Sequence, residues 1–171
     1  MQRREELDAL FTHAYEELRR LASAVRRGDP SATLTPTVLV HEAWRRLARG
    51  GESATQSEAH FKHIAARAMR RVLIEAARAR KAAKRGGGAA FVTFDDGLEA
   101  GPCTSEDVLA LDAAIEALTR ISPRQARMIE SRFFGGLDVR ETAELLGVSE
   151  ATVERDWRAA KAWLALEMRR N

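Results

Sequence analysis

The most specific local pattern in the chain is VRETAELLGVSEATVERDWR, residues 139–158. A helix-turn-helix crosses two short helices at a tight turn, so it needs a small residue at the crossing and a residue in the turn that tolerates positive φ. Ala143 and Gly147 stand four residues apart in those two positions, and Ser149 follows as the cap of the second helix. The apolar residues spaced to hold the second helix down are Leu146, Val148, Val153 and Trp157. The stretch therefore predicts a helix-turn-helix.

The second helix of this motif carries side chains suited to DNA. Arg155 and Arg158 stand past the cap and can contact guanine edges or phosphates in a major groove, and Thr152 can reach a phosphate. We count Ser149 with this predicted DNA-binding set. The charges exposed on the helix nearly cancel, and phosphate neutralisation supplies most of the affinity for DNA. We therefore expect a second DNA-binding surface elsewhere in the chain.

Composition and charge narrow the class of protein. The chain has 171 residues, is 45% apolar and is poor in strand-forming residues, which favours an all-α fold. It has no apolar run of roughly 18 residues and no signal peptide, so we expect a cytoplasmic protein without membrane insertion. Its single cysteine, Cys103, excludes an intramolecular disulfide framework and a CxxC site.

The charges are unevenly distributed along the chain. Residues 1–85 carry a net charge of +8, residues 86–107 carry −5, and residues 108–171 are neutral. A basic block, an acidic tether and a balanced block suggest two domains, one of which faces a polyanion. The alternative is a genome that enriches arginine and alanine without any function behind it.

Apolar periodicity and capping residues place the helices. We predict a helix over residues 5–27, a helix that opens at Pro36 behind a Thr35 cap and stops at Gly50, and a third that begins near Ser57. After a Gly-rich stretch the helical period returns at Glu106, and a helix that opens at Ser122-Pro123 is closed by Gly135-Gly136. The predicted fold is therefore all-α, with two small helical domains, residues 1–85 and 106–171, joined by a flexible linker, residues 86–105.

The third predicted helix is strongly basic. In HFKHIAARAMRRVLIEAARARKAAKR, residues 60–85, the apolar side chains occupy one face and the basic ones ring the other, as expected of a surface that follows a nucleic-acid backbone. A merely solvated face is the alternative. The residues predicted to contact DNA are Arg67, Arg70, Arg71, Arg78, Arg80 and Lys81.

These residues resemble the extracytoplasmic-function (ECF) sigma factors of bacterial RNA polymerase along nearly the whole chain. LVHEAWRRL (39–47) is similar to the family's polymerase-binding helix, AMRRVLIEAARAR (68–80) to its promoter-opening segment, and residues 123–164 to its second sigma domain. The resemblance implies that residues 1–85 are sigma domain 2, which reads the −10 element, and that residues 106–171 are sigma domain 4, which reads the −35 element. The residues it implies for polymerase binding are Leu39, His41, Glu42, Arg45 and Arg46.

One departure from the family pattern suggests regulation. Relatives carry an acidic cluster just before the polymerase-binding helix, where this chain has Thr35-Pro36-Thr37-Val38 without a carboxylate. TPTVLVHEAW and VERDWRAAKAWL are also similar to a branch of the family associated with Ser/Thr kinases. We therefore expect Thr37, with Thr35 as second choice, to be phosphorylated, because a phosphate would restore the missing charge. The expected partners are core RNA polymerase, promoter DNA, a Ser/Thr protein kinase and an anti-sigma factor.

Two other classes of function compete with this interpretation. One is a helix-turn-helix regulator that acts without polymerase. The other is a metal-dependent nuclease or hydrolase that uses His60 and His63, with His13 and His41 as further donors. No HExxH or carboxylate–histidine pattern accompanies these histidines, and no glycine loop suited to phosphate is present. We therefore expect no catalysis, no metal and no cofactor.

Overall fold

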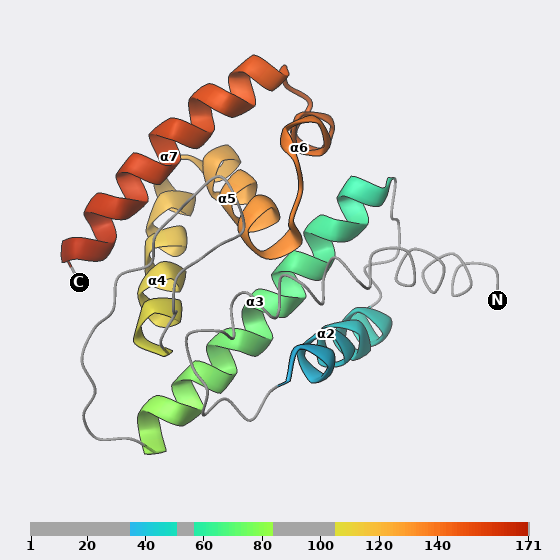
Figure 1. The fold of residues 1–171 in the computed structure, drawn as a ribbon, viewed down its shortest axis with the longest axis vertical. Coiled ribbons are helices and arrows are strands. Elements are labelled where there is room, and N and C mark those ends of the chain that lie inside the picture. The colour runs from blue at the N-terminus through green and yellow to red at the C-terminus, as the bar shows by residue number, and fades with distance from the viewer. Residues whose placement is uncertain (1–34, 51–56, 84–104, 171) are drawn as a thin grey trace.

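The computed structural model describes residues 35–50, 57–83 and 105–170, and these residues form six helices (Figure 1). In chain order the helices are α2 (Pro36–Gly50), α3 (Glu58–Ala83), α4 (Ser105–Ile121), α5 (Pro123–Gly135), α6 (Val139–Leu146) and α7 (Glu150–Arg170). The described ranges contain no strand, so the prediction of an all-helical protein is confirmed for them. The helix predicted at residues 5–27, and the predicted linker up to Ser105, lie outside the described residues.

The ends of the helices follow the predicted local signals. The amide of Val38 donates to the side-chain oxygen of Thr35 over 3.2 Å, so Thr35 caps α2 in front of Pro36. Gly136 ends α5 in the left-handed region at φ 66°, and Gly147 ends α6 in the same region at φ 64°. Only glycine adopts this conformation without a steric penalty, so both residues stop a helix where the sequence predicts a stop.

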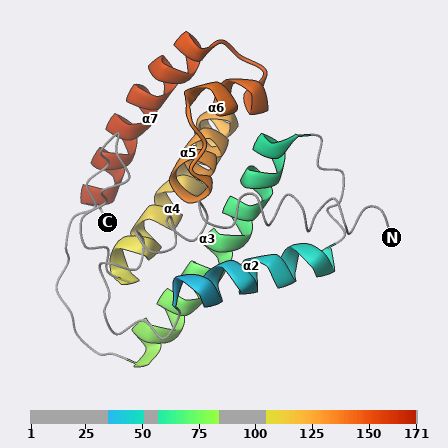
Figure 2. The same cartoon turned by 45° about the vertical axis from the view of Figure 1, so that its right-hand side comes forward.

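Helix α3 occupies the middle of the structure. It packs against α2 on one side and against α4 and α5 on the other, as the two views in Figures 1 and 2 show. Helix α7 covers α4 and α5 without contacting α3, while the short α6 bridges α3, α5 and α7. The first predicted domain therefore contacts the helices of the second through the 26-residue α3.

The apolar core is continuous across both predicted domains. Phe61 and Met69 of α3 belong to the same buried cluster as Ile115, Ile129 and Leu164 of the later helices. Close approach of α5 to α3 is possible because Gly135 has no side chain. A Cβ at this position would lie 3.0 Å from the carbonyl oxygen of Lys62. The described parts of residues 1–85 and 106–171 thus meet directly, and the division into two domains stays a prediction.

Candidate nucleic-acid interface

Helices α6 and α7 are joined by a turn of three residues, Gly147, Val148 and Ser149. A capping box opens α6: Asp138 accepts from the Glu141 amide over 2.7 Å, and the Glu141 carboxylate accepts from the Asp138 amide over 3.0 Å. Ser149 caps α7, since its side-chain oxygen accepts from the Thr152 amide over 3.2 Å. The cap predicted for Ser149 is therefore confirmed, and its hydroxyl is engaged within the helix start.

The first turns of α7 present charged side chains to solvent. Arg155 and Arg158 are exposed, and Thr152 is half-buried. The Arg155 guanidinium lies 3.6 Å from a carboxylate oxygen of Asp156, and Arg158 donates to the backbone carbonyl of Glu154 over 3.4 Å. Both contacts are within the same helix, and the Arg155 side chain remains 68% exposed beside the buried Asp156, so both arginines stay accessible to a nucleic acid.

The opposite side of α7 is anchored to α5. Asp156 is 7% exposed, and its carboxylate accepts a 3.1 Å hydrogen bond from Nε of Arg124 and a second one from the same guanidinium. Trp157 is also buried, and the Arg132 guanidinium lies 4.2 Å from its ring centre. The two neighbouring buried residues fix which side of α7 faces outward.

The basic residues of α3 do not all lie on one exposed face. Arg71, Arg78 and Lys81 are exposed, whereas Arg67 and Arg80 are half-buried. Arg70 is only 8% exposed and Lys62 only 5% exposed. The expectation that the basic side chains ring an exposed face is therefore wrong for Arg70 and Lys62, because both turn toward the helices that follow. With α4 and α5 packed against α3, the Arg70 guanidinium is not accessible to DNA. DNA contact by Arg70 stays a prediction that would require these helices to move away.

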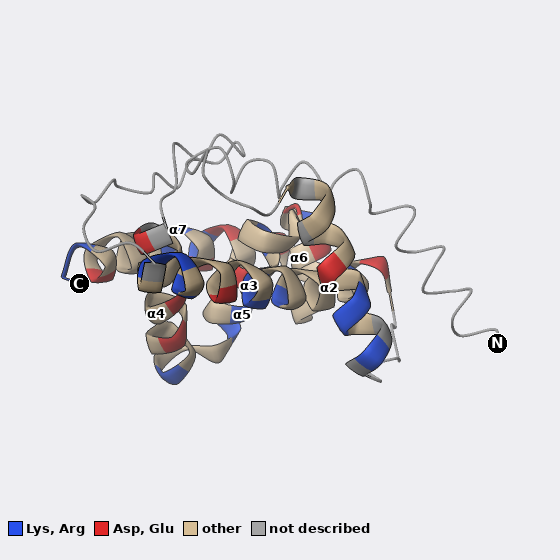
Figure 3. Cartoon of the chain, turned by 90° about the horizontal axis from the view of Figure 1, so that it is seen from below, with Lys and Arg blue, Asp and Glu red and all other residues tan. Residues whose placement is uncertain are grey.

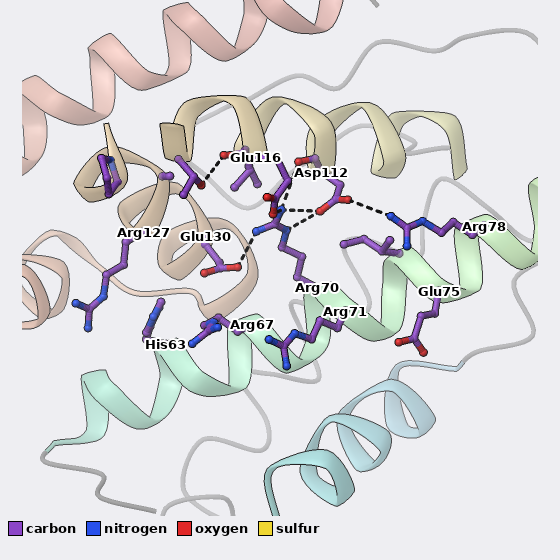
Figure 4. Close-up of a pocket in the computed structure, with 15 residues that line it drawn as sticks. His63, Arg67, Arg70, Arg71, Glu75, Arg78, Asp112, Glu116, Arg127 and Glu130 are labelled. Atoms are coloured by element: carbon purple, nitrogen blue, oxygen red, sulfur yellow. Dashed lines mark hydrogen bonds and ion pairs between the residues drawn. The ribbon is translucent and has the colours of Figure 1, made fainter. Parts of the chain in front are cut away.

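Arg70 lies at the centre of a cluster of carboxylates from α4 and α5 (Figure 4). It donates to the side chain of Asp112 over 2.6 and 2.9 Å, to Glu116 over 2.9 Å, and to Glu130 over 2.9 Å. Burial by itself would lower the pKa of Arg70, but the hydrogen bonds and charges of Glu130 and Asp112 outweigh it and raise the pKa. The guanidinium is therefore charged and saturated with acidic partners.

Sequence reasoning did not single out these acids. Figure 3 shows acidic segments (red) on α4 and basic segments (blue) on α2 and α3. Asp112 and Glu116 are four residues apart, so they share one face of their helix. That spacing predicts an acidic strip on one face of α4. It does not predict Arg70 as the partner, because Arg70 and Asp112 are 42 residues apart in the sequence.

An open pocket of about 680 Å³ lies beside this cluster, between α3, α4 and α5. Arg67, Arg71 and Arg127 line it together with His63 (Figure 4). His63 is 7% exposed, and its Nδ1 lies 2.7 Å from the hydroxyl of Ser131. The Ser131 hydroxyl also lies 2.7 Å from the backbone carbonyl oxygen of Arg127, to which it can donate.

Burial and nearby positive charge keep His63 neutral. Burial, followed by the charges of Arg127, Arg67 and His60, lowers the pKa of His63 from 6.5 to about 4. A neutral imidazole that forms a hydrogen bond with a hydroxyl across the α3–α5 contact is a packing element. It gives no support to His60 and His63 as a metal pair, and the described ranges hold no group of three or more metal-binding side chains.

The residues predicted to bind polymerase lie along α2. Arg46 donates to both carboxylate oxygens of Glu75 on α3, over 2.8 and 2.7 Å, and to Glu42 over 3.4 Å. The hydrogen bond with Glu75 is the main reason that the pKa of Arg46 is raised and that of Glu75 lowered. Arg45 also pairs with Glu42 and remains 61% exposed, and His41 is exposed. Arg45 and His41 thus lie on the outer face of α2, whereas Arg46 is half-buried against α3; the side chain of Leu39 is not among those described.

Comparison with known families decides what kind of protein this is. A family model described as ECF sigma factor matches residues 4–170. The chain belongs to the ECF sigma factor family. No curated protein and no solved structure matches it. This sigma factor acts in transcription initiation, with core RNA polymerase and promoter DNA as partners, and members of the family are usually bound by anti-sigma factors.

Family membership also decides between the competing functions. ECF sigma factors are DNA-binding transcription regulators and not enzymes, so the nuclease or hydrolase alternative is wrong. A sigma role likewise takes precedence over a regulator that acts without polymerase. None of the helices in the described part of the chain is long and apolar enough to cross a membrane.

Proposed function

We propose that this sigma factor reads promoters through two surfaces: α3 of residues 1–85 at the −10 element, and α6–α7 of residues 106–171 at the −35 element. The observation that carries the proposal is the α6–turn–α7 unit, whose Ser149 cap and buried Asp156 direct Arg155 and Arg158 outward. A helix held in this way can enter a major groove with its first turns.

The −35 assignment is tested by substituting Arg155 and Arg158 with alanine. Losing a good base-edge contact weakens recognition by about 1–3 kcal/mol, so promoter affinity of the holoenzyme should fall at least about tenfold. The matched control is Arg169→Ala with Arg170→Ala, which removes the same charge from the exposed far end of α7. Circular dichroism checks that both variants are folded. An unchanged promoter footprint in the first variant would exclude this role.

The −10 assignment rests on the exposed basic side chains of α3. Arg71, Arg78 and Lys81 point to solvent, and Arg67 lines the pocket beside them. Each lost phosphate contact should lower the slope of log affinity against log salt by about 0.7–0.9. Salt titrations of polymerase–promoter complexes with Arg71→Gln and Arg78→Gln measure that slope. If it stays at the wild-type value, these side chains form only a solvated face.

The outer face of α2 is the proposed polymerase contact. Arg45 and His41 are exposed there, and Glu42 links Arg45 to Arg46, which is half-buried against α3. Arg45 is the sharpest probe, because it is more exposed than Glu42 and Arg46 and its ion pair with Glu42 lies within α2. Arg45→Glu should weaken binding to core polymerase at least about tenfold, whereas Arg120→Glu, exposed on α4, should not.

We further propose that phosphorylation of Thr37 by a Ser/Thr kinase switches polymerase binding on. Thr37 is exposed in the first turn of α2, and that turn contains no acidic residue. A phosphate adds about −1.5 to −2 charges, which the helix dipole favours at this end. Thr35 is already used as the cap, so Thr37 can take a phosphate without loss of a helix-capping bond.

The switch is tested by measuring core-polymerase affinity with and without kinase treatment. The wild type should bind weakly before treatment and at least about tenfold more tightly after it. Thr37→Ala should remove this response, and Thr35→Ala should keep it while losing some helix stability. Thr37→Glu should recover part of the gain, because a carboxylate carries less charge than a phosphate. Equal, tight binding by all unphosphorylated forms would refute the switch.

A further inference from the structure

The contacts between α3 and the later helices are unusually rich in charge. Three polar links run along one side of α3: Lys62 to Glu141 over 2.6 Å, His63 to Ser131, and Arg70 to its carboxylates. The contact of α2 with α3 consists of buried apolar residues such as Val40 and Ala43 and of one ion pair, Arg46 to Glu75, whose side chains are far more exposed than that of Arg70, at 33% and 58%. Contacts between domains that separate are typically more polar than permanent ones, because their groups must also be soluble apart.

The Arg70 cluster is not explained by stability alone. Bringing a guanidinium and carboxylates out of water carries a large desolvation penalty, and apolar side chains of similar volume often stabilise a fold as well or better. Asp112 and Glu130 are mostly buried, at 15% and 13% exposed, whereas Glu116 remains 62% exposed. Apolar side chains could therefore stabilise the contact between α3 and the helices α4 and α5 equally well. Charged groups are expected at such a contact if the helices must also separate in water.

We propose that the acidic surface of Asp112, Glu116 and Glu130 is an intramolecular competitor of promoter DNA, which holds the chain closed by occupying Arg70. This inference rests on the proposed promoter contact of α3. Carboxylates and phosphates bind a guanidinium through the same charge-assisted hydrogen bonds, so the two cannot use Arg70 at once. In the closed form Arg70 has acidic partners on both α4 and α5, and its access to DNA requires these helices to leave α3.

The closed form lowers the apparent affinity for DNA. When only a fraction of the molecules is competent to bind, the apparent dissociation constant rises by the inverse of that fraction. A change from about 1% open to about half open would therefore strengthen binding about fiftyfold without any new contact. Weakening the acidic surface should increase DNA binding, and the increase should depend on Arg70.

The first test neutralises two acids in the full-length chain, Asp112→Asn with Glu130→Gln. Its matched control is Glu106→Gln with Glu167→Gln, two acids of α4 and of the far end of α7 that lie outside the cluster and outside the proposed DNA-binding surfaces, which changes the net charge equally. Fluorescence anisotropy with duplex promoter DNA should give at least about tenfold tighter binding than in the control. Adding Arg70→Gln to the neutralised variant should abolish this gain. A gain no larger than that of the control, or one that survives Arg70→Gln, overturns the inference.

The second test leaves the charges of the cluster unchanged and compares two redox states of one protein, so any effect of the substitutions themselves is common to both states. A Cβ at position 135 would lie 3.1 Å from the Cβ of Ala66, less than the 3.5–4.5 Å usual in disulfides, so α3 and α5 must move apart by a few tenths of an ångström to accept the bond. Ala66→Cys with Gly135→Cys, in a Cys103→Ser background, therefore allows α3 and α5 to be joined by oxidation. The oxidised protein should bind promoter DNA at least about tenfold more weakly than the same protein after reduction. Equal binding by both states overturns the inference.

The outcomes separate this inference from the proposed function. If the reduced protein and the wild type bind promoter with core polymerase, but neither neutralisation nor oxidation changes that binding, the self-inhibition is wrong and the promoter role stands. If no form binds promoter even with core polymerase, the proposed function fails, and the inference fails with it.

Discussion

Lowering the pH should destabilise the folded chain through His63. The imidazole is buried, and its pKa is about 4 in the fold against 6.5 for an unperturbed histidine. Its contribution is complete above pH 6.5 and is lost as the pH falls toward 4, because the unfolded chain then takes up a proton that the folded chain excludes. The full difference corresponds to about 3 kcal/mol, of which about 2 kcal/mol is lost between pH 7 and pH 5.

Urea unfolding at pH 7 and pH 5 measures this loss. His63→Gln removes the titrating ring, so the wild type should lose about 2 kcal/mol more than this variant over the same pH interval. Other ionisable groups titrate in both proteins and cancel in the comparison. His60→Gln, which removes a half-buried imidazole three residues away, is the matched control and should keep the steep pH dependence. If wild type and His63→Gln lose equal stability, the reasoning about His63 is wrong.

Further predictions concern glycines, a cap and the core. Gly135→Ala should destabilise the fold by about 1–3 kcal/mol in urea unfolding, because the added methyl meets the carbonyl oxygen of Lys62. Gly147→Ala has open space around its Cβ but a positive φ, so it should lower the free energy of unfolding by only about 1–2 kcal/mol. Amide exchange should show that α6 still ends at this position. Asp138→Ala should cost about 1 kcal/mol in the same assay, since α6 loses its capping box. Leu164→Ala should cost about 2–5 kcal/mol and lower the melting temperature, because the side chain is fully buried.

Local chemistry made the helix boundaries predictable. Pro36 behind Thr35, Ser149 before α7, and Gly136 and Gly147 after their helices all act within a few residues of themselves. Each signal follows from the dihedral angles or hydrogen-bonding groups of the residue concerned, so it can be recognised without knowledge of the partners. The same holds for the buried face of α7 at Val153 and Trp157, which periodicity alone identifies.

Pairing between distant helices was not predictable in the same way. Arg70 lies among basic residues in the sequence, and only the packing of α3 against α4 and α5 turns it away from solvent. Lys62 is buried for the same reason, since its partner Glu141 is 79 residues away and also belongs to the capping box of α6. A single sequence gives the charge of such residues and the face they occupy, but not which face another helix covers.

The contact between Arg124 and Asp156 has a consequence for how selective this sigma factor can be. A helix tied down at one buried carboxylate cannot turn about its own axis, and each residue along it is rotated by a constant step. Under the proposed function, Arg155 and Arg158 therefore have their binding orientation before the promoter is bound, and little rotational freedom of the helix is lost on binding. Promoter choice would then depend on a residue that touches no base: loosening Asp156 should make the sigma factor tolerant of sequences it now rejects.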